Sequence, residues 1–187
     1  MANSPAIQQL FEDLATANQI LANEGVFDGF GHISVRNPEN PERFFIARSM
    51  APASVKASDI VECDLNGDVH DAQGRKSYLE RFIHSAIFKK RPDVNSVVHS
   101  HSPAIIPFGV TGARLRPICH MSGFLGSNVP TFEIRDHHRD GHKDDPEWNP
   151  CQYIEHEATV GPAPDKVPTS RNPHPQLDPT HPLPLTL

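Results

Sequence analysis

The sequence has few cysteines and no long apolar run. Its three cysteines, Cys63, Cys119 and Cys151, lie far apart in 187 residues and form no Cys-x-x-Cys pair. A sparse, odd set of cysteines argues against a disulfide framework and indicates a reducing compartment. No apolar stretch approaches the roughly 18 residues that a membrane helix needs, and no basic segment followed by an apolar run opens the chain. We therefore expect a cytoplasmic protein with no membrane partner.

The chain also lacks an excess of positive charge. Its 17 lysine and arginine residues are outnumbered by 23 aspartate and glutamate residues, which gives a formal net charge of -6. Nucleic-acid-binding domains usually present a basic stripe, and none is visible here. We therefore expect no nucleic-acid partner. No internal repeat is apparent, and the length is sufficient for one domain with a substantial core.

Regular apolar spacing predicts the elements of the first 70 residues. Ser4-Pro5 is typical of a helix start, apolar residues continue at helical spacing, and Gly25 ends this helix after about 18 residues. An alternation of polar and apolar residues predicts a strand over 30–36, and further strands are predicted over 43–47 and 58–64, the first two antiparallel. Asn66-Gly67 predicts a two-residue hairpin turn with positive φ at both positions, and a returning strand follows it.

Residues 77–90 are predicted to form a helix with a carboxylate in its first turn. Pro92 stops this helix because proline disfavours helical geometry in the residue before it. Glu80 has two interpretations that the spacing leaves open. With Ser77 it fits a capping box, in which the glutamate binds a backbone N–H at the helix start; alternatively, its carboxylate serves a metal or catalytic site. The apolar residues on one helical face are Leu79, Phe82, Ile83, Ala86 and Ile87.

A strand predicted over residues 94–101 ends in two histidines. Residues two apart in a strand project from one face, so His99 and His101 point the same way. Two imidazoles on one strand, with a carboxylate nearby, favour a divalent-metal site, although a short His-x-His pattern also arises by chance. His84, one turn after Glu80, would be either a partner of these ligands or exposed.

The pattern becomes less regular beyond residue 102. A helix is predicted to open over 103–108, an edge strand over 114–119 and a brief strand over 131–134. After Asp136 no helical or strand periodicity persists, and about half of the 19 prolines lie in this segment. We therefore expect one domain over residues 1–136 and a proline-rich, disordered tail over residues 137–187.

Four segments together resemble the class II aldolase/adducin family. They are Gly31–Arg36, Leu79–His84, Arg91–Val94 and Val97–His101, in the family's order and spacing, and the resemblance covers about residues 5 to 136. It implies an α/β, three-layer α/β/α fold around a largely antiparallel sheet, which we expect to be C-terminally incomplete. It also implies a homotetramer that acts on a small molecule with Zn²⁺ or Mn²⁺ as cofactor. His99 and His101 would be metal ligands, and Glu80 the acid/base group that also touches the metal.

The resemblance narrows the substrate class. Phosphosugar aldolases of this family hold phosphate with a Gly-Asn, a Thr-Gly and a Ser-Ser pair. An arginine and a histidine at such positions suit a carboxylate or a phenolate, and a tyrosine adds an aromatic wall. The residues implied to contact substrate are Gly31, His32, Arg48, Ser49 and Tyr78. We therefore expect a decarboxylase-like lyase of secondary metabolism that acts on a hydroxylated aromatic carboxylate.

One part of the family pattern has no counterpart in this sequence. The family's third metal histidine ends a strand well after the His-x-His segment, whereas the later histidines here occupy no comparable strand; they include His137, His138, His142, His156 and His174. Two alternatives stay open, a retro-aldol aldolase acting on a small hydroxy-carbonyl compound and a non-catalytic, adducin-like assembly module. Decarboxylation and retro-aldol cleavage both leave an electron pair beside an oxygen-bearing carbon, so the residues predict a lyase better than the bond that it breaks.

Overall fold

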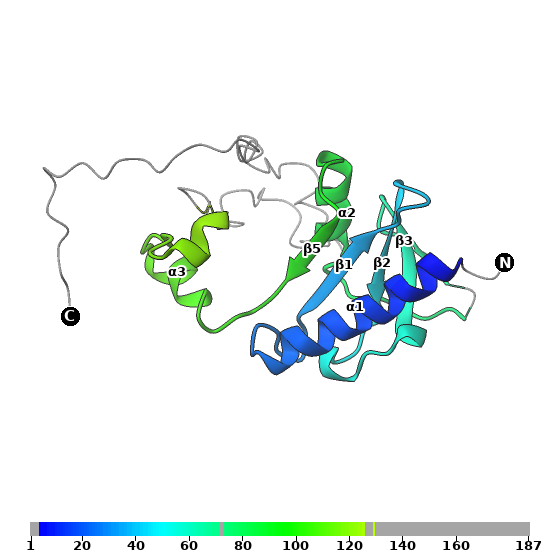
Figure 1. The fold of residues 1–187 in the computed structure, drawn as a ribbon, viewed down its shortest axis with the longest axis horizontal. Coiled ribbons are helices and arrows are strands. Elements are labelled where there is room, and N and C mark those ends of the chain that lie inside the picture. The colour runs from blue at the N-terminus through cyan, green and yellow to red at the C-terminus, as the bar shows by residue number, and fades with distance from the viewer. Residues whose placement is uncertain (1–3, 72, 126–128, 130–187) are drawn as a thin grey trace, which may run out of the picture.

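The computed structural model describes residues 4–71, 73–125 and 129, and it contains a five-stranded antiparallel sheet of order β4-β3-β2-β1-β5 (Figure 1). The strands are β1 (His32–Arg36), β2 (Arg43–Ala47), β3 (Ile60–Asp64), β4 (Val69–His70) and β5 (Ser96–His99). The helices are α1 (Pro5–Asn23), α2 (Arg81–Lys90) and α3 (Ile106–Thr111), with 3₁₀ turns η1 (Pro52–Ser54), η2 (Ala57–Asp59) and η3 (His120–Leu125). None of the helices in this part of the chain combines the length and apolar character needed to cross a membrane. The predicted α/β class is confirmed.

Helix α1 begins and ends as predicted from the sequence. Ser4 is its N-cap, and the Ser4 hydroxyl oxygen accepts a hydrogen bond of 3.2 Å from the Ile7 N–H. Gly25 follows the helix with a φ of +67°, the left-handed conformation common after helix ends. On the inner face, the Phe11 ring packs edge-on against Phe45 of β2 with ring centroids 4.9 Å apart.

Strand β2 shows why the fold has three layers. Phe44 and Phe45 are neighbours in the strand and therefore point to opposite faces of the sheet. Phe45 contacts α1, whereas Phe44 packs against Phe88 of α2 with ring centroids 5.2 Å apart. The two helices thus cover opposite faces of the sheet, with α1 crossing its front in Figure 1.

Strand β1 places a layer of buried polar side chains beneath α2. His32, Ser34 and Arg36 alternate along the strand and are all buried. The Arg36 guanidinium donates hydrogen bonds to the carbonyl oxygens of Phe88 at 2.7 Å and Arg91 at 3.1 Å. These carbonyls lie at the C-terminal end of α2, where a helix leaves acceptors unsatisfied. Arg36 therefore fixes one end of α2 over the sheet, while His32 and Ser34 lie further along the same face.

Helix α2 begins at Arg81, four residues later than predicted. Ser77 forms a β-bridge with Arg48, and its hydroxyl donates to the carbonyl of Ala47 at 2.9 Å. Glu80 is the residue before the helix, and no side-chain capping bond forms there. The capping-box interpretation of Glu80 is therefore wrong, because Ser77 is committed to the sheet.

The buried face of α2 also differs from the prediction. His84, Ser85 and Phe88 are buried together with Ala86, whereas Leu79 precedes the helix and is 66% exposed. Two polar residues thus take positions in the core. The prediction placed only apolar residues inward. It was right for Ala86 and for Ile87, which packs against the core, but it missed His84, Ser85 and Phe88.

Two smaller predictions are wrong as well, whereas the helix predicted to open over 103–108 is present as α3. Four residues, 65–68, lie between β3 and β4. Among them Gly67 alone has a positive φ, of +84°, and the N–H of Asp64 bonds to the carbonyl of Asp68. This is the longer hairpin with glycine in its left-handed position, in place of the two-residue turn. Residues 114–119 form no strand, and α3 begins at Ile106. The strand predicted over 131–134 and the tail 137–187 lie outside the described residues.

Candidate active site

Four histidines lie side by side between the sheet and α2. His32 is on β1, His84 on α2, His99 at the end of β5, and His101 two residues later; we call these four residues the histidine cluster. His32 and His99 are direct partners in the β1–β5 register. The His32 ring stacks on the rings of His84 and His99, in both cases with centroids 4.9 Å apart, and on Tyr78 at 4.1 Å.

The structure brings His99 and His101 together at the outer end of the cluster. Their Nε2 atoms are 3.0 Å apart, and their rings are nearly perpendicular. Two nitrogen ligands of a tetrahedral zinc ion are separated by about 3.3 Å, given Zn–N bonds of about 2.0–2.1 Å. Both side chains are partly exposed. A small adjustment of either ring would therefore allow both nitrogens to bind one ion.

Glu80 lies near this pair without joining it. Within residues 4–71, 73–125 and 129, no group of three or more His, Cys, Asp or Glu side chains is arranged to hold a metal ion. Burial lowers the pKa of His99, and the charge of Glu80 acts against this effect. The same charge acts on His32. The Glu80 carboxylate is thus within electrostatic range of the histidine cluster, from a half-buried position before α2.

The two inner histidines are enclosed and neutral. Both His32 and His84 have no exposed surface, and burial lowers the pKa of His32 to about 4 and the pKa of His84 well below its ordinary value. Nδ1 of His32 lies 2.9 Å from the Phe30 carbonyl, and Nδ1 of His84 lies 2.6 Å from the Ser34 hydroxyl. In each ring, the buried Nε2 has no hydrogen-bond partner among the described residues. The alternative that His84 is exposed is therefore wrong.

Asp28 belongs to the site, although the sequence did not single it out. Its Oδ2 lies 3.1 Å from Nδ1 of His101. Its Oδ1 accepts hydrogen bonds from the backbone N–H groups of Phe30 at 2.8 Å and Gly31 at 2.9 Å, and the bond from Phe30 contributes most to lowering the pKa of Asp28. Asp-Gly before a strand was a visible turn signal. Its pairing with a histidine 73 positions later depends on the β1–β5 register, which the sequence does not show.

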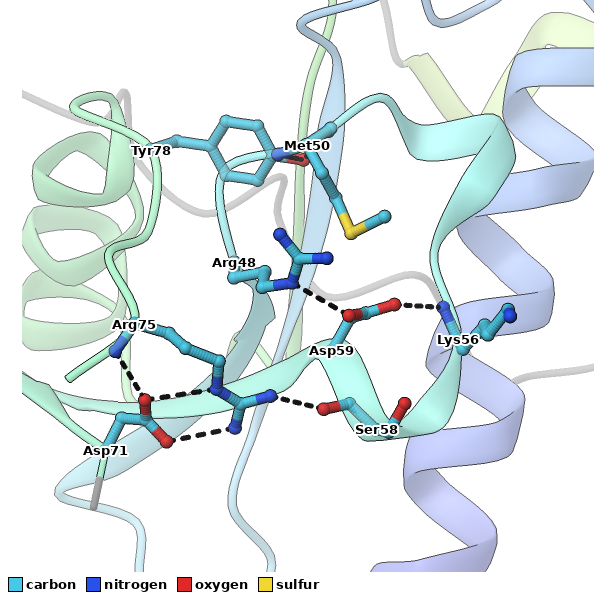
Figure 2. Close-up of polar contacts among 8 residues, drawn as sticks. All are labelled: Arg48, Met50, Lys56, Ser58, Asp59, Asp71, Arg75 and Tyr78. Carbon is cyan, nitrogen blue, oxygen red and sulfur yellow. Dashed lines mark hydrogen bonds and ion pairs between the residues drawn. The ribbon is translucent and has the colours of Figure 1, made fainter. Parts of the chain in front are cut away.

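Arg48 and Tyr78 lie near one another around Met50 (Figure 2). Tyr78 is buried, and its hydroxyl donates a hydrogen bond to the Met50 carbonyl. Nε of Arg48 donates to Oδ1 of Asp59 at 2.8 Å, and both residues line an open recess of about 570 Å³. The recess is otherwise lined by Gln19, Met50, Ala53, Ser54, Lys56 and Ser58. Met50, which lines the recess, accepts the Tyr78 hydroxyl, and the Tyr78 ring stacks on His32, so the recess is linked to the histidine cluster through Tyr78.

The Arg48–Asp59 pair is held firmly from several sides. Burial alone would raise the pKa of Asp59, but the hydrogen bonds from Arg48 and from the Lys56 N–H outweigh it and lower the pKa. The Lys56 N–H donates to Oδ2 of Asp59 at 3.0 Å, and Arg75 donates to the adjacent Ser58 carbonyl while pairing with Asp71 (Figure 2). Asp59 thus stays ionised and fixes the plane of the Arg48 guanidinium.

The remaining residues predicted to contact substrate are Gly31 and Ser49. The backbone N–H group of each already has a hydrogen-bond partner. The N–H of Gly31 donates to Asp28, and the N–H of Ser49 donates to the Lys76 carbonyl at 2.9 Å. A Cβ at Gly31 would lie 2.6 Å from the Phe27 ring, so close packing requires glycine at this position. Ser49 is exposed. The structure therefore places Gly31 against Asp28 and Ser49 beside the recess-forming loop.

Comparisons with known proteins agree with this fold. The family model of the Class II Aldolase and Adducin N-terminal domain matches residues 12–144. The chain is 46% identical over 132 residues to "Decarboxylase tropJ" of Talaromyces stipitatus, covering 67% of this chain and 48% of that protein. It is 35% identical over 117 residues to the 3,4-dihydroxyphthalate decarboxylase of Arthrobacter keyseri, covering 57% and 46%.

A solved structure shows the same architecture. L-fuculose 1-phosphate aldolase from Glaciozyma antarctica matches with a TM-score of 0.54 and 31% sequence identity, covering 62% of this chain and 51% of that chain. The chain spans about half the length of the curated relatives and of the solved structure that it matches.

Proposed function

Because this chain belongs to the class II aldolase and adducin family, we propose that it forms part of a divalent-metal-dependent carbon–carbon lyase that decarboxylates a hydroxylated aromatic carboxylate. The observation that carries this proposal is the 3.0 Å approach of the His99 and His101 Nε2 atoms within electrostatic range of Glu80. The identities of 46% and 35% to two proteins named as decarboxylases support the type of reaction.

The histidine pair fits a zinc ion well. Imidazole nitrogen is a usual zinc ligand, and manganese would be favoured if a carboxylate such as Glu80 joined the two imidazoles. We assign His99 and His101 as two of the ligands; a third is not provided by the described residues. When bound, the ion would stabilise negative charge on an oxygen next to the reacting carbon.

Glu80 is the proposed proton donor. When the bond to the carboxylate carbon breaks, carbon dioxide leaves and the electron pair stays on the ring carbon, which must then take up a proton. Glu80 makes no capping bond at α2. Its charge acts on His32, His99 and Tyr78, so its carboxyl group lies among the residues that would surround the substrate.

Arg48 is the proposed anchor for a substrate carboxylate or phenolate. A guanidinium binds a carboxylate through two parallel N–H bonds. Because Asp59 occupies Nε, the two terminal nitrogens of Arg48 point away from Asp59 toward Met50 (Figure 2). Tyr78 and His32 would provide an aromatic wall beside an aromatic substrate, and Gly31 and Ser49 would line its edges.

Retro-aldol cleavage is the second candidate reaction. The 31% identity to an L-fuculose 1-phosphate aldolase favours it, and the same three residues, Glu80, His99 and His101, would serve either reaction. However, the charges that line the recess favour a substrate carboxylate over a substrate phosphate. The ionised Asp59 lies beside Arg48, and a carboxylate in this position repels a doubly charged phosphate more strongly than it repels a singly charged carboxylate.

An assay of carbon dioxide release tests the proposal. The purified full chain, supplied with zinc or manganese, would be given a panel of hydroxylated benzoates and phthalates. We expect at least one to release carbon dioxide. Arg48→Gln should raise KM for that compound roughly tenfold or more, since it removes a charge-assisted pair, whereas Lys56→Gln, the other cation of the recess, should leave KM unchanged.

Other outcomes of the same assay separate the alternatives. Cleavage of a phosphorylated hydroxy-ketone with no carbon dioxide from any compound would replace decarboxylation by aldol cleavage. A protein that binds no metal and acts on no compound would be an assembly module of the adducin kind. We also propose a homo-oligomer, a tetramer by family resemblance, and light scattering of the purified chain would measure it.

A further inference from the structure

We propose that Asp28 is a positioning residue that sets the tautomer of His101, so that a lone pair of Nε2 and not an N–H faces the metal position. This inference rests on the proposed metal site, because it explains how one of its ligands is prepared. It concerns a residue that contacts His101 at 3.1 Å and lies outside the ligand pair itself.

The two oxygens of Asp28 have different partners. Oδ1 accepts the N–H groups of Phe30 and Gly31, at 2.8 and 2.9 Å, and Oδ2 faces Nδ1 of His101. An ionised carboxylate only accepts hydrogen bonds, so the Nδ1 atom of His101 must carry the proton of this contact. A neutral imidazole has one N–H, and therefore Nε2 of His101 presents its lone pair.

This assignment also determines the state of His99. The two Nε2 atoms are 3.0 Å apart, a hydrogen-bond distance. Because His101 offers a lone pair there, Nε2 of His99 must donate in the metal-free protein. His101 is thus ready to bind a cation, whereas His99 has to move its proton from Nε2 before it can do so. The two ligands are therefore not equivalent.

The loop that holds the Asp28 carboxylate is fixed by the packing of the fold. The Gly31 backbone is pressed against the buried Phe27 ring, since even a Cβ at Gly31 would lie 2.6 Å from it. Both N–H donors to Oδ1 belong to this short loop before β1. The Asp28 and His101 side chains are about two-fifths exposed, so their contact adds little to stability. The main effect of the Asp28–His101 contact is to orient the His101 ring, as other carboxylate–histidine pairs do at metal sites.

Asp28→Asn is the decisive variant. It keeps the size and shape of the side chain, but the group that faces Nδ1 of His101 changes from a hydrogen-bond acceptor to a donor. The amide oxygen of asparagine must stay with the Phe30 and Gly31 N–H groups, since the NH₂ group cannot accept their hydrogen bonds. The NH₂ group then faces Nδ1 of His101 and donates to it. His101 would be forced into the tautomer with its proton on Nε2, where it cannot bind a metal.

Long-range ¹H–¹⁵N NMR of the histidine rings measures the tautomers directly. The spectra would be recorded on the metal-free full chain near pH 8.5, about two units above the ordinary histidine pKa. We expect His101 with its proton on Nδ1 and His99 with its proton on Nε2 in the unsubstituted protein. Asp28→Asn should invert both, whereas Asp13→Asn, an exposed position on α1, should change neither. A proton on Nε2 of His101 in the unsubstituted protein would overturn the proposal, whether or not the variant folds.

Zinc titration against a chelating dye separates this inference from the proposed function. We expect Asp28→Asn to weaken zinc binding by roughly 10- to 100-fold, the usual effect of losing such a partner, with an unchanged thermal midpoint. Inverted tautomers with unchanged zinc affinity would contradict a role for Asp28 at the metal. If the unsubstituted chain shows the expected tautomers but binds no zinc, the proposed function fails and the tautomer assignment stands.

Discussion

The two faces of the central sheet differ in the kind of residue that they bury. The face under α1 is closed by apolar contacts such as that of Phe11 with Phe45. The face under α2, over β1 and β5, encloses His32, Ser34 and His84. Burial of apolar area stabilises the fold, whereas a buried polar atom without a partner destabilises it. Apolar contacts stabilise both faces, since Phe44 packs against Phe88 on the α2 side, but the buried histidines lie on the α2 side alone.

The largest effect is expected at Glu80, on the α2 side. Glu80→Gln should lower kcat for decarboxylation by roughly 10²- to 10⁴-fold, the usual contribution of a proton donor. It should leave the unfolding midpoint unchanged, because Glu80 makes no capping bond. Steady-state kinetics and thermal melts measure both quantities. Glu42→Gln, at an exposed position between β1 and β2, is the control, and equal kcat in the two variants would remove Glu80 from the mechanism.

A matching change on the α1 side should affect only stability. Phe45→Ala removes a buried ring that contacts α1, and we expect the free energy of unfolding to fall by about 3–5 kcal/mol. Chemical denaturation measures this difference. Leu79→Ala, which truncates an apolar side chain that is 66% exposed, should change it by less than about 0.5 kcal/mol. A small effect at Phe45 would show that its contact with α1 contributes little to stability.

Acid should weaken the α2 side through its buried histidines. The folded protein keeps His32 neutral because its pKa is lowered to about 4, whereas the unfolded chain binds a proton near pH 6.5. Between these values the unfolded state holds more protons, so the free energy of unfolding falls as pH drops from 6.5 to 4, by about 3 kcal/mol for His32. The lowered pKa of His84 acts in the same direction.

Carboxylates also titrate in acid, so the comparison needs a variant. Denaturant unfolding of metal-free protein and of His32→Gln would be followed from pH 7 to pH 4.5. The stability of His32→Gln should depend less steeply on pH over this interval. Parallel curves for the two proteins would show that His32 is protonated in the folded state.

A smaller effect on stability than that of Phe45→Ala is expected from removing a buried polar pair. Replacing both Ser34 with Ala and His84 with Leu takes away the 2.6 Å hydrogen bond and the unpartnered Nε2 of His84 together. Such a paired replacement is nearly neutral or stabilising, so the free energy of unfolding should change by less than about 1.5 kcal/mol. Activity should still fall, because His84 supports the His32 ring that stacks on His99. Unchanged activity would limit His84 to a packing role.

Much of the α1 side could be predicted from the sequence. The spacing of apolar residues after Ser4 gave the length of α1, because this helix buries apolar residues with a regular period, and the alternation of residues 30–36 gave β1. The resemblance to a family added the three-layer arrangement. These features depend on local pattern, which a single sequence displays.

The α2 side could be predicted only in part. His99 and His101 were identified as a pair, but the apolar stripe chosen for α2 was only partly right, because His84 and Ser85 also occupy core positions. Asp28 was missed because only the pairing of β1 with β5 brings it to His101. A polar residue in the core leaves no periodic signal, and a contact across 73 positions requires knowledge of strand order.

The metal content of the purified full chain tests the central claim most directly. Elemental analysis by mass spectrometry would compare the unsubstituted protein with His99→Ala and with His70→Ala, a histidine on β4 that pairs with Asp64 away from the cluster. We predict bound zinc or manganese in the unsubstituted protein and in His70→Ala, and its loss in His99→Ala. Equal and negligible metal in all three proteins would contradict a metal site at His99 and His101.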